Sequence, residues 1–122
     1  MTRMIKESMF VIAVPDLKKS ADFYENVLGF EVAEIGDDGW RLYMKDACHI
    51  MADNCPDAIH PNELGDHSYF CYLVVDSADD YYAELVSNKA DLGVPPEDKP
   101  WQMREFGLTT IDGHRINIGE RL

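Results

Sequence analysis

The sequence predicts an α+β fold built from two successive βαβββ modules. Both halves show the same order of patterns, in which an apolar, β-rich run is followed by a helical pattern and then by short strands. Asp16 and Asp76 each end the first strand of their half, and they lie 60 residues apart, about half the chain. A repeated order at this spacing indicates an internal duplication, which decides the fold class.

The first half begins with a buried strand, predicted by the apolar run Met9–Val14. A helix follows over 16–29, because apolar residues recur there at helical spacing. Asp16 or Ser20 can supply the N-cap, and Gly29 suits the left-handed residue that ends a helix. Turn residues then separate three short strands, which we expect at 30–35, 40–45 and 48–53.

The second half repeats this order after a connection rich in Pro, Gly, Asn and Asp. The expected elements are a strand at 67–75, a helix at 76–88, a short strand piece and a Pro-rich loop at 92–101, and strands at 103–110 and 115–120. Asp76 or Ser77 can cap the helix, and Asp112–Gly113 is a turn between the last two strands. Each half is too small to fold alone. We therefore predict one domain over 1–122, with module one at 8–53, a linker at 54–66 and module two at 67–120.

Charge and composition exclude several classes of partner. The net charge of −12 gives a surface that repels nucleic acid and anionic lipid, whereas it attracts cationic ligands. Acidity also aids solubility in general, so charge alone identifies no ligand. No run approaches the roughly 18 apolar residues of a membrane helix. Cys48, Cys55 and Cys71 are an odd number without a C-x-x-C spacing, which favours reduced thiols and a cytoplasmic protein.

The stretch 14–30, VPDLKKSADFYENVLGF, together with the two βαβββ modules, resembles the vicinal oxygen chelate superfamily. That superfamily includes glyoxalase I, extradiol dioxygenases, fosfomycin-resistance enzymes and bleomycin-resistance proteins. The resemblance covers nearly the whole chain. It implies two modules whose strands form a curved mixed sheet around a cleft, with the helices on the outer face, usually in a dimer.

The resemblance also shows where a metal would be held in the superfamily's enzymes. The matching positions are Met9, Phe70, Asn117 and, in a looser alignment, Met51. Divalent Mg, Mn, Ni or Fe prefer carboxylates, imidazoles and water, which these residues do not provide. We therefore expect no metal and no other cofactor. The alternative is a diverged metal-dependent glyoxalase, lyase or dioxygenase with an unexpected ligand set, such as His49 with Glu105.

One branch of the superfamily is the most similar. The stretch 99–114, KPWQMREFGLTTIDGH, resembles the bleomycin-resistance proteins, as do DDGW at 37–40 and HSYFCYLVVDSADDYY at 67–82. Members of that branch bind the drug without metal or chemistry, at the interface of an acidic dimer. The resemblance thus implies a metal-free homodimer that sequesters a planar or cationic, bleomycin-like ligand. A scaffold or regulatory domain without a small ligand is a third interpretation.

Strand alternation predicts which side chains line the cleft. Phe106, Leu108, Ile116 and Ile118 should face the helices, which leaves the intervening residues on the cleft side. The predicted ligand-binding residues are Trp40, His49, Met51, Phe70, Tyr72, Trp101, Met103, Glu105, Arg115 and Asn117. Aromatic rings and a carboxylate suit a flat, cationic ligand. As alternatives, Trp40 packs beside its turn, and Glu105 pairs with Arg104 or Arg115 on a solvated surface.

Overall fold

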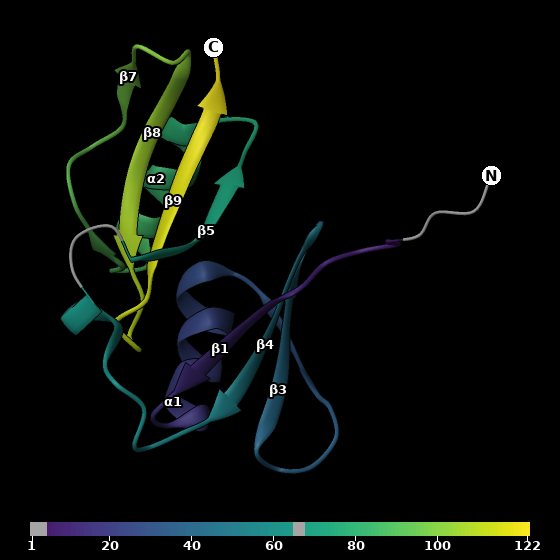
Figure 1. Ribbon diagram of the computed structural model, residues 1–122. Helices are drawn as coiled ribbons and strands as arrows, with labels where there is room; N and C mark the ends of the chain where they lie inside the picture. The colour runs from purple at the N-terminus through teal and green to yellow at the C-terminus, as the bar shows by residue number, and fades with distance from the viewer. Residues whose placement is uncertain (1–4, 65–67) are drawn as a thin grey trace.

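A computed structural model describes residues 5–64 and 68–122 and shows two modules that lie side by side (Figure 1). Each module has its own sheet with one helix on one face, so the predicted α+β fold of two βαβββ modules is confirmed. His67, the first residue of the predicted second module, lies outside the described residues. Within the described ranges, no helix is long and apolar enough to span a membrane.

Module one forms a four-stranded mixed sheet in the order β1-β4-β3-β2. Its elements are β1 Phe10–Val14, α1 Leu17–Phe23, a π-helical turn Tyr24–Leu28, β2 Glu31–Glu34, β3 Trp40–Lys45 and β4 Cys48–Asn54. β1 and β4 run parallel, and the other pairs are antiparallel. The predicted helix thus continues to Leu28, but its last turn is π-helical and ends at Gly29, whose φ is 79°.

Module two repeats this arrangement with the order β5-β9-β8-β6. Its elements are a short 3-10 turn Pro61–Leu64 in the connection, β5 Tyr69–Val74, α2 Ala78–Ser87, β6 Asp91–Leu92, β7 Glu97–Lys99, β8 Met103–Thr109 and β9 Arg115–Arg121. β7 lies within the predicted Pro-rich loop, and it pairs with the start of β8 through the turn 99–102. Gln102 adopts the left-handed backbone conformation that this turn requires, with a φ of 65°.

Both helices begin in the same way, which reflects the duplication. Asp16 caps α1 by accepting a hydrogen bond from the Lys19 amide, and Ser77 caps α2 by accepting one from the Asp80 amide. Of the paired candidates, Ser20 and Asp76 are therefore not the caps. A second free amide of each helix donates to a side chain from the last strand of its module, Leu17 N to Asn54 and Ala78 N to Glu120. These contacts fix each helix across its own sheet.

The core lies between each helix and its sheet, as alternation predicted. Phe106, Leu108, Ile116 and Ile118 are each at most 4% exposed. In module one the rings of Tyr24 and Tyr43 stack with centroids 4.3 Å apart. The opposite face of each sheet lacks a helix, and this face carries the predicted ligand-binding residues.

Hydrogen bonds between distant residues join the two modules. The His114 ring, at the start of β9, is 3.1 Å from the carbonyl oxygen of Ala13 in β1. Ser20 donates to Asp112 over 2.8 Å, although the two residues are 92 positions apart. On the other side of the junction, the Tyr81 hydroxyl donates to the Leu28 carbonyl oxygen over 3.2 Å. The junction is therefore specified by polar contacts from both helices and from the β8–β9 turn.

Candidate functional site

Four of the predicted residues come together on the uncovered face of module two. Glu105 accepts hydrogen bonds on one carboxylate oxygen from the Tyr72 hydroxyl, at 2.7 Å, and from the Trp101 indole nitrogen, at 2.8 Å. Met103 lies on the same strand face. We call Tyr72, Trp101, Met103 and Glu105 the aromatic platform. Glu105 is 8% exposed and Trp101 is 61% exposed, so a buried carboxylate orients an open ring.

The local sequence explains this geometry. Glu105 pairs with Gly119 on the neighbouring strand, and a side chain at position 119 would overlap the Tyr72 hydroxyl. The glycine therefore lets the Tyr72 ring lie across β9 to reach Glu105. Burial, followed by the hydrogen bond to Glu105, raises the pKa of Tyr72 to about 12, so the phenol stays protonated and donates.

Arg104 and Arg115, the alternative partners of Glu105, make contacts with other residues. Arg104 forms ion pairs with Asp79 and Asp98, each at 3.0 Å, on the helix side of the sheet. Arg115 donates to Ser68 over 3.3 Å. Glu105 therefore belongs to the platform rather than to a solvated ion pair.

The other predicted residues of module two adjoin the platform or the junction. Asn117 lies on the platform face of β9, where it pairs with Tyr72 on one side and with Gly107 on the other. Arg115 lies two residues earlier on the same face. Phe70 packs edge-on against Phe10 of module one, with centroids 5.8 Å apart, so it lies where the modules meet.

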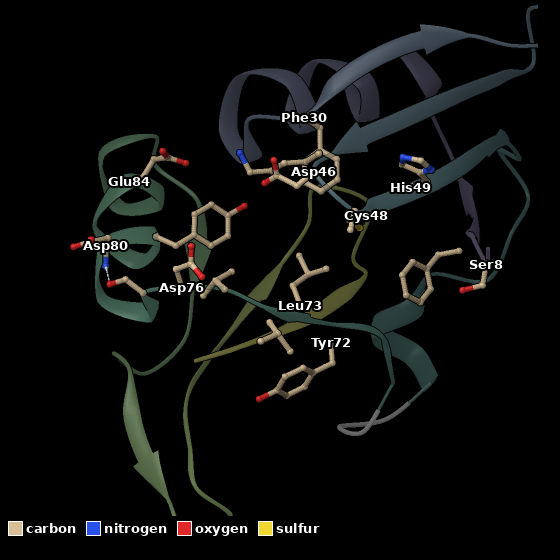
Figure 2. A pocket seen from close by; sticks show the side chains of 17 residues that line it. Ser8, Phe30, Asp46, Cys48, His49, Tyr72, Leu73, Asp76, Asp80 and Glu84 are labelled. Atoms are coloured by element: carbon tan, nitrogen blue, oxygen red, sulfur yellow. Dashed lines mark hydrogen bonds between the residues drawn. The ribbon is translucent and has the colours of Figure 1, made fainter. Parts of the chain in front are cut away.

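The predicted residues of module one form a separate, more apolar surface. Met51 pairs with Val11 on one side and with Leu42 on the other, across the face that α1 does not cover. Trp40 begins β3 on that face and is half-buried. His49, on the opposite side of β4 from Cys48, borders the space between the modules (Figure 2). The single chain thus divides the ten predicted residues between two sheet faces and the junction.

A cavity of about 670 Å³ lies at this junction (Figure 2), and we call it the junction cavity. One wall comes from module one and includes Phe30, Asp46 and Cys48. The other comes from the end of β5 and from α2, which contributes Asp80 and Glu84. His49 and Tyr72 are the predicted site residues that border the cavity.

Sequence reasoning missed most of the junction cavity, although one signal was present. Asp76, Asp80 and Glu84 follow each other at intervals of four, and this spacing places Asp80 and Glu84 on one side of α2, just after Asp76. The module-one wall gives no comparable signal, because Phe30, Asp46 and Cys48 lie on different elements.

A second polar cluster is buried beneath the β8–β9 turn. The Tyr43 hydroxyl donates to Ser20, and Ser20 donates to Asp112, each over 2.8 Å. Burial raises the pKa of Asp112 to about 6. Burial also lowers the pKa of His114 to about 4, assisted by the positive charge of His60. These groups lie away from the platform and hold the modules together.

The side chains present do not fit the metal that the superfamily's enzymes carry. Met51 and Asn117 occupy equivalent places in the two modules, since each lies on the strand next to the first strand. With Met9 and Phe70 they offer two thioethers, a phenyl ring and one amide, so a single oxygen ligand is available to a hard divalent ion. Among residues 5–64 and 68–122, no three His, Cys, Asp or Glu side chains gather as a metal site.

A family model described as the Glyoxalase/Bleomycin resistance protein/Dioxygenase superfamily matches residues 8–118. The chain belongs to this superfamily. No curated protein matches the chain significantly. The superfamily contains binding proteins as well as enzymes, so membership alone leaves both kinds of activity open.

Solved structures of superfamily members share this fold at low identity. The bleomycin resistance determinant encoded on transposon Tn5 is 19% identical, with a TM-score of 0.79, over 96% of this chain and 98% of its own. A bleomycin-binding protein in complex with bleomycin is 21% identical, with a TM-score of 0.74, over 97% and 100%. A superfamily member from Sphaerobacter thermophilus DSM 20745 is 22% identical, with a TM-score of 0.74, over 98% and 100%. At these identities the likeness shows the fold.

Proposed function

We propose that this protein binds and sequesters a planar or cationic, antibiotic-like small molecule, without metal and without a chemical step. The aromatic platform carries the proposal. Glu105 holds the Tyr72 and Trp101 side chains in place through its carboxylate, so the indole is oriented before a ligand arrives. An ordered ring beside a carboxylate suits a flat cation. A bleomycin-binding protein and a bleomycin resistance determinant with the same fold support this ligand class.

We propose that the ligand-binding form is a homodimer in the cytoplasm. Val11, Val74 and Trp101 are each more than half exposed on faces without a helix. Exposed apolar side chains on uncovered sheet faces are typical of an interface. A second copy would cover it and supply the wall opposite the platform. The free state of Cys48, Cys55 and Cys71 is compatible with a reducing compartment.

Ligand titration tests the binding proposal. Bleomycin is added to the protein while Trp emission and binding heat are recorded. Trp40 and Trp101 are the two tryptophans of the chain, so Trp40→Phe and Trp101→Phe each leave one reporter. We expect bleomycin to change the emission of Trp101. Glu105→Gln should weaken binding about ten-fold, the equivalent of one hydrogen bond to a charged group. The absence of binding heat at tens of micromolar bleomycin would refute the drug-specific proposal.

Sedimentation equilibrium tests the dimer. Val74 and Val86 are matched in exposure, at 52% and 53%, but Val74 lies on the platform face and Val86 on α2. We expect twice the 13.9 kDa chain mass for the native protein and for Val86→Asp. Val74→Asp should shift the protein to the monomer, because it places a charge in the interface. A monomeric native protein would contradict the proposed assembly.

A further inference from the structure

The junction cavity is large enough for a drug-sized molecule and differs in chemistry from the platform. Its volume of about 670 Å³ falls within the usual range of ligand pockets, on the order of 300 to 1,000 Å³. Phe10, Phe30 and Tyr81 give it aromatic walls from both modules. An organic molecule could therefore bury an apolar body there.

An ammonium group of the protein itself already lies in this cavity. The Nζ atom of Lys45 is 5.9 Å from the centroid of the Tyr81 ring, and it is 3.4 Å from the carbonyl oxygen of Gly29. A Cβ at Gly29 would lie 3.3 Å from this Nζ and 3.9 Å from a carboxylate oxygen of Glu84. The glycine thus leaves room for a cation between a ring, a carbonyl oxygen and a carboxylate.

The Lys45 ammonium is held weakly. A distance of 5.9 Å is at the outer limit for a cation over a ring, and 3.4 Å is long for a hydrogen bond. The flexible stem of a lysine can carry the group out to water at little cost. The surroundings that hold this ammonium can therefore accept another cation in its place.

We propose that the junction cavity is a second ligand site, for an organic monocation with an aromatic body. The charged end of the ligand replaces the Lys45 ammonium over the Tyr81 ring, next to Glu84. The aromatic body lies against Phe10 and Phe30. Lys45 then acts as a tethered competitor that tunes the affinity of the site. The site is separate from the Trp101–Glu105 part of the platform and does not depend on that part binding a drug.

A pair of probes with the same shape tests the preference for charge. (4-Hydroxyphenyl)trimethylammonium is a cation, and 4-tert-butylphenol is its neutral counterpart. Each is titrated into the full chain while amide shifts are followed by NMR. We expect shifts at Phe30, Cys48 and Tyr81, and tighter binding of the cation. Equal affinity for the two probes would overturn the proposal.

Three substitutions and one control distinguish the removal of the Lys45 ammonium from the cavity from the loss of a positive charge elsewhere on the protein. Lys45→Met should raise the affinity for the cationic probe about five-fold, because the competing ammonium is gone. Lys18→Met removes the same charge on the exposed side of α1 and should change the affinity less than two-fold. Tyr81→Phe keeps the ring and should retain the preference for the cation, whereas Glu84→Gln should reduce it. A Lys45→Met variant with unchanged or weaker cation binding would contradict the role of Lys45.

Cys48 reports directly on occupancy of the cavity. Its thiol borders the cavity, and a hydrogen bond with Cys71 lowers its pKa, which favours the reactive thiolate. We expect the cationic probe to slow alkylation of Cys48 by iodoacetamide but not that of Cys55, which lies outside the cavity. The protection should persist in Trp101→Phe and Glu105→Gln. Protection that disappears in these variants would place the probe on the platform and overturn the second site.

Discussion

The pH dependence of folding should separate two buried titratable groups at the module junction, Asp112 and His114. Asp112 is 3% exposed and His114 is 7% exposed, so solvent screens neither strongly. Burial raises the pKa of Asp112 and lowers that of His114. Replacing Asp112 with Asn removes one titration and keeps an oxygen that can accept the hydrogen bond from Ser20.

The two groups affect the free energy of unfolding in opposite directions. The pKa of Asp112 is about 6 in the folded chain, against 3.8 for the ordinary group. Its contribution is fully present below pH 3.8 and is lost as the pH rises through 6, a change of about 3 kcal/mol. The pKa of His114 is about 4, against 6.5. Its contribution is present above pH 6.5 and is lost as the pH falls through 4, again about 3 kcal/mol.

Between pH 4 and 6 the two contributions to the free energy of unfolding change with pH by similar amounts in opposite directions, so they cancel in the native protein. The reason is that the folded chain holds the Asp112 proton while it excludes the His114 proton. In Asp112→Asn, only the His114 contribution to the free energy of unfolding still changes with pH. Its free energy of unfolding, relative to the native protein, should therefore fall by about 3 kcal/mol as the pH decreases from about 6.5 to 4. Asp16 and His60, whose charges act on this cluster, are present in both proteins.

Urea unfolding followed by circular dichroism, at half-unit steps of pH, measures this difference. The difference curve between variant and native protein cancels the titrations that the two chains share. His114→Gln keeps an amide donor for the Ala13 carbonyl oxygen and should give the opposite slope. Parallel pH profiles for Asp112→Asn and the native protein would refute the assigned pKa of Asp112.

Two further substitutions test the packing of the site and the core. Gly119→Ala should displace the Tyr72 hydroxyl from Glu105, because the new Cβ overlaps it. We expect the Trp101 indole to be less ordered and its emission to shift to the red, with strand content retained in circular dichroism. Unchanged emission would count against the platform. Tyr24→Phe should stabilise the fold by about 1 kcal/mol in urea unfolding, since the buried Tyr24 hydroxyl has no hydrogen-bond partner among the described residues. A clear loss of stability in Tyr24→Phe would show that the hydroxyl is satisfied.

Local pattern was sufficient to predict the fold and the strand faces that carry the candidate site residues. Alternation with a period of two placed Phe106 and Ile118 in the core and Glu105 on the opposite face, because a strand turns successive side chains to opposite sides. It also placed Tyr72 and Glu105 on one face, although it could not predict their hydrogen bond. That contact requires the register of β5, β9 and β8, which depends on pairing between distant segments.

The junction could not be predicted, because it depends on how the modules pack. The bond between Ser20 and Asp112 joins residues that local spacing cannot relate. Ser20 was a candidate cap on composition, yet it is fully buried and used between modules. β7 lies where the Pro-rich sequence predicts a loop, because Pro and charged residues are depleted in strands, and pairing with β8 overrides that preference. Secondary-structure propensity is a property of one segment, whereas the buried hydrogen bond of Ser20 and the pairing of β7 depend on contacts between distant segments.

The strand registers also explain why the two modules offer a ligand different walls. In module one, the row across β1, β4 and β3 is Val11, Met51 and Leu42. In module two, the equivalent row across β5, β9 and β8 is Tyr72, Asn117 and Gly107. The first row is apolar and filled by side chains, whereas the second has polar groups and an open place at the glycine.

The next row carries one carboxylate in each module, but on a different strand. Trp40 pairs with Asp53 in module one, where Glu105 pairs with Gly119 in module two. The two faces therefore differ: the row of Val11, Met51 and Leu42 is apolar in module one, whereas module two presents Tyr72, Asn117 and Glu105 beside glycines. A ligand held between a module-one face and a module-two face would bury its apolar side on the first and place its charge near Glu105 on the second. Two identical faces could not distinguish the two sides of such a ligand.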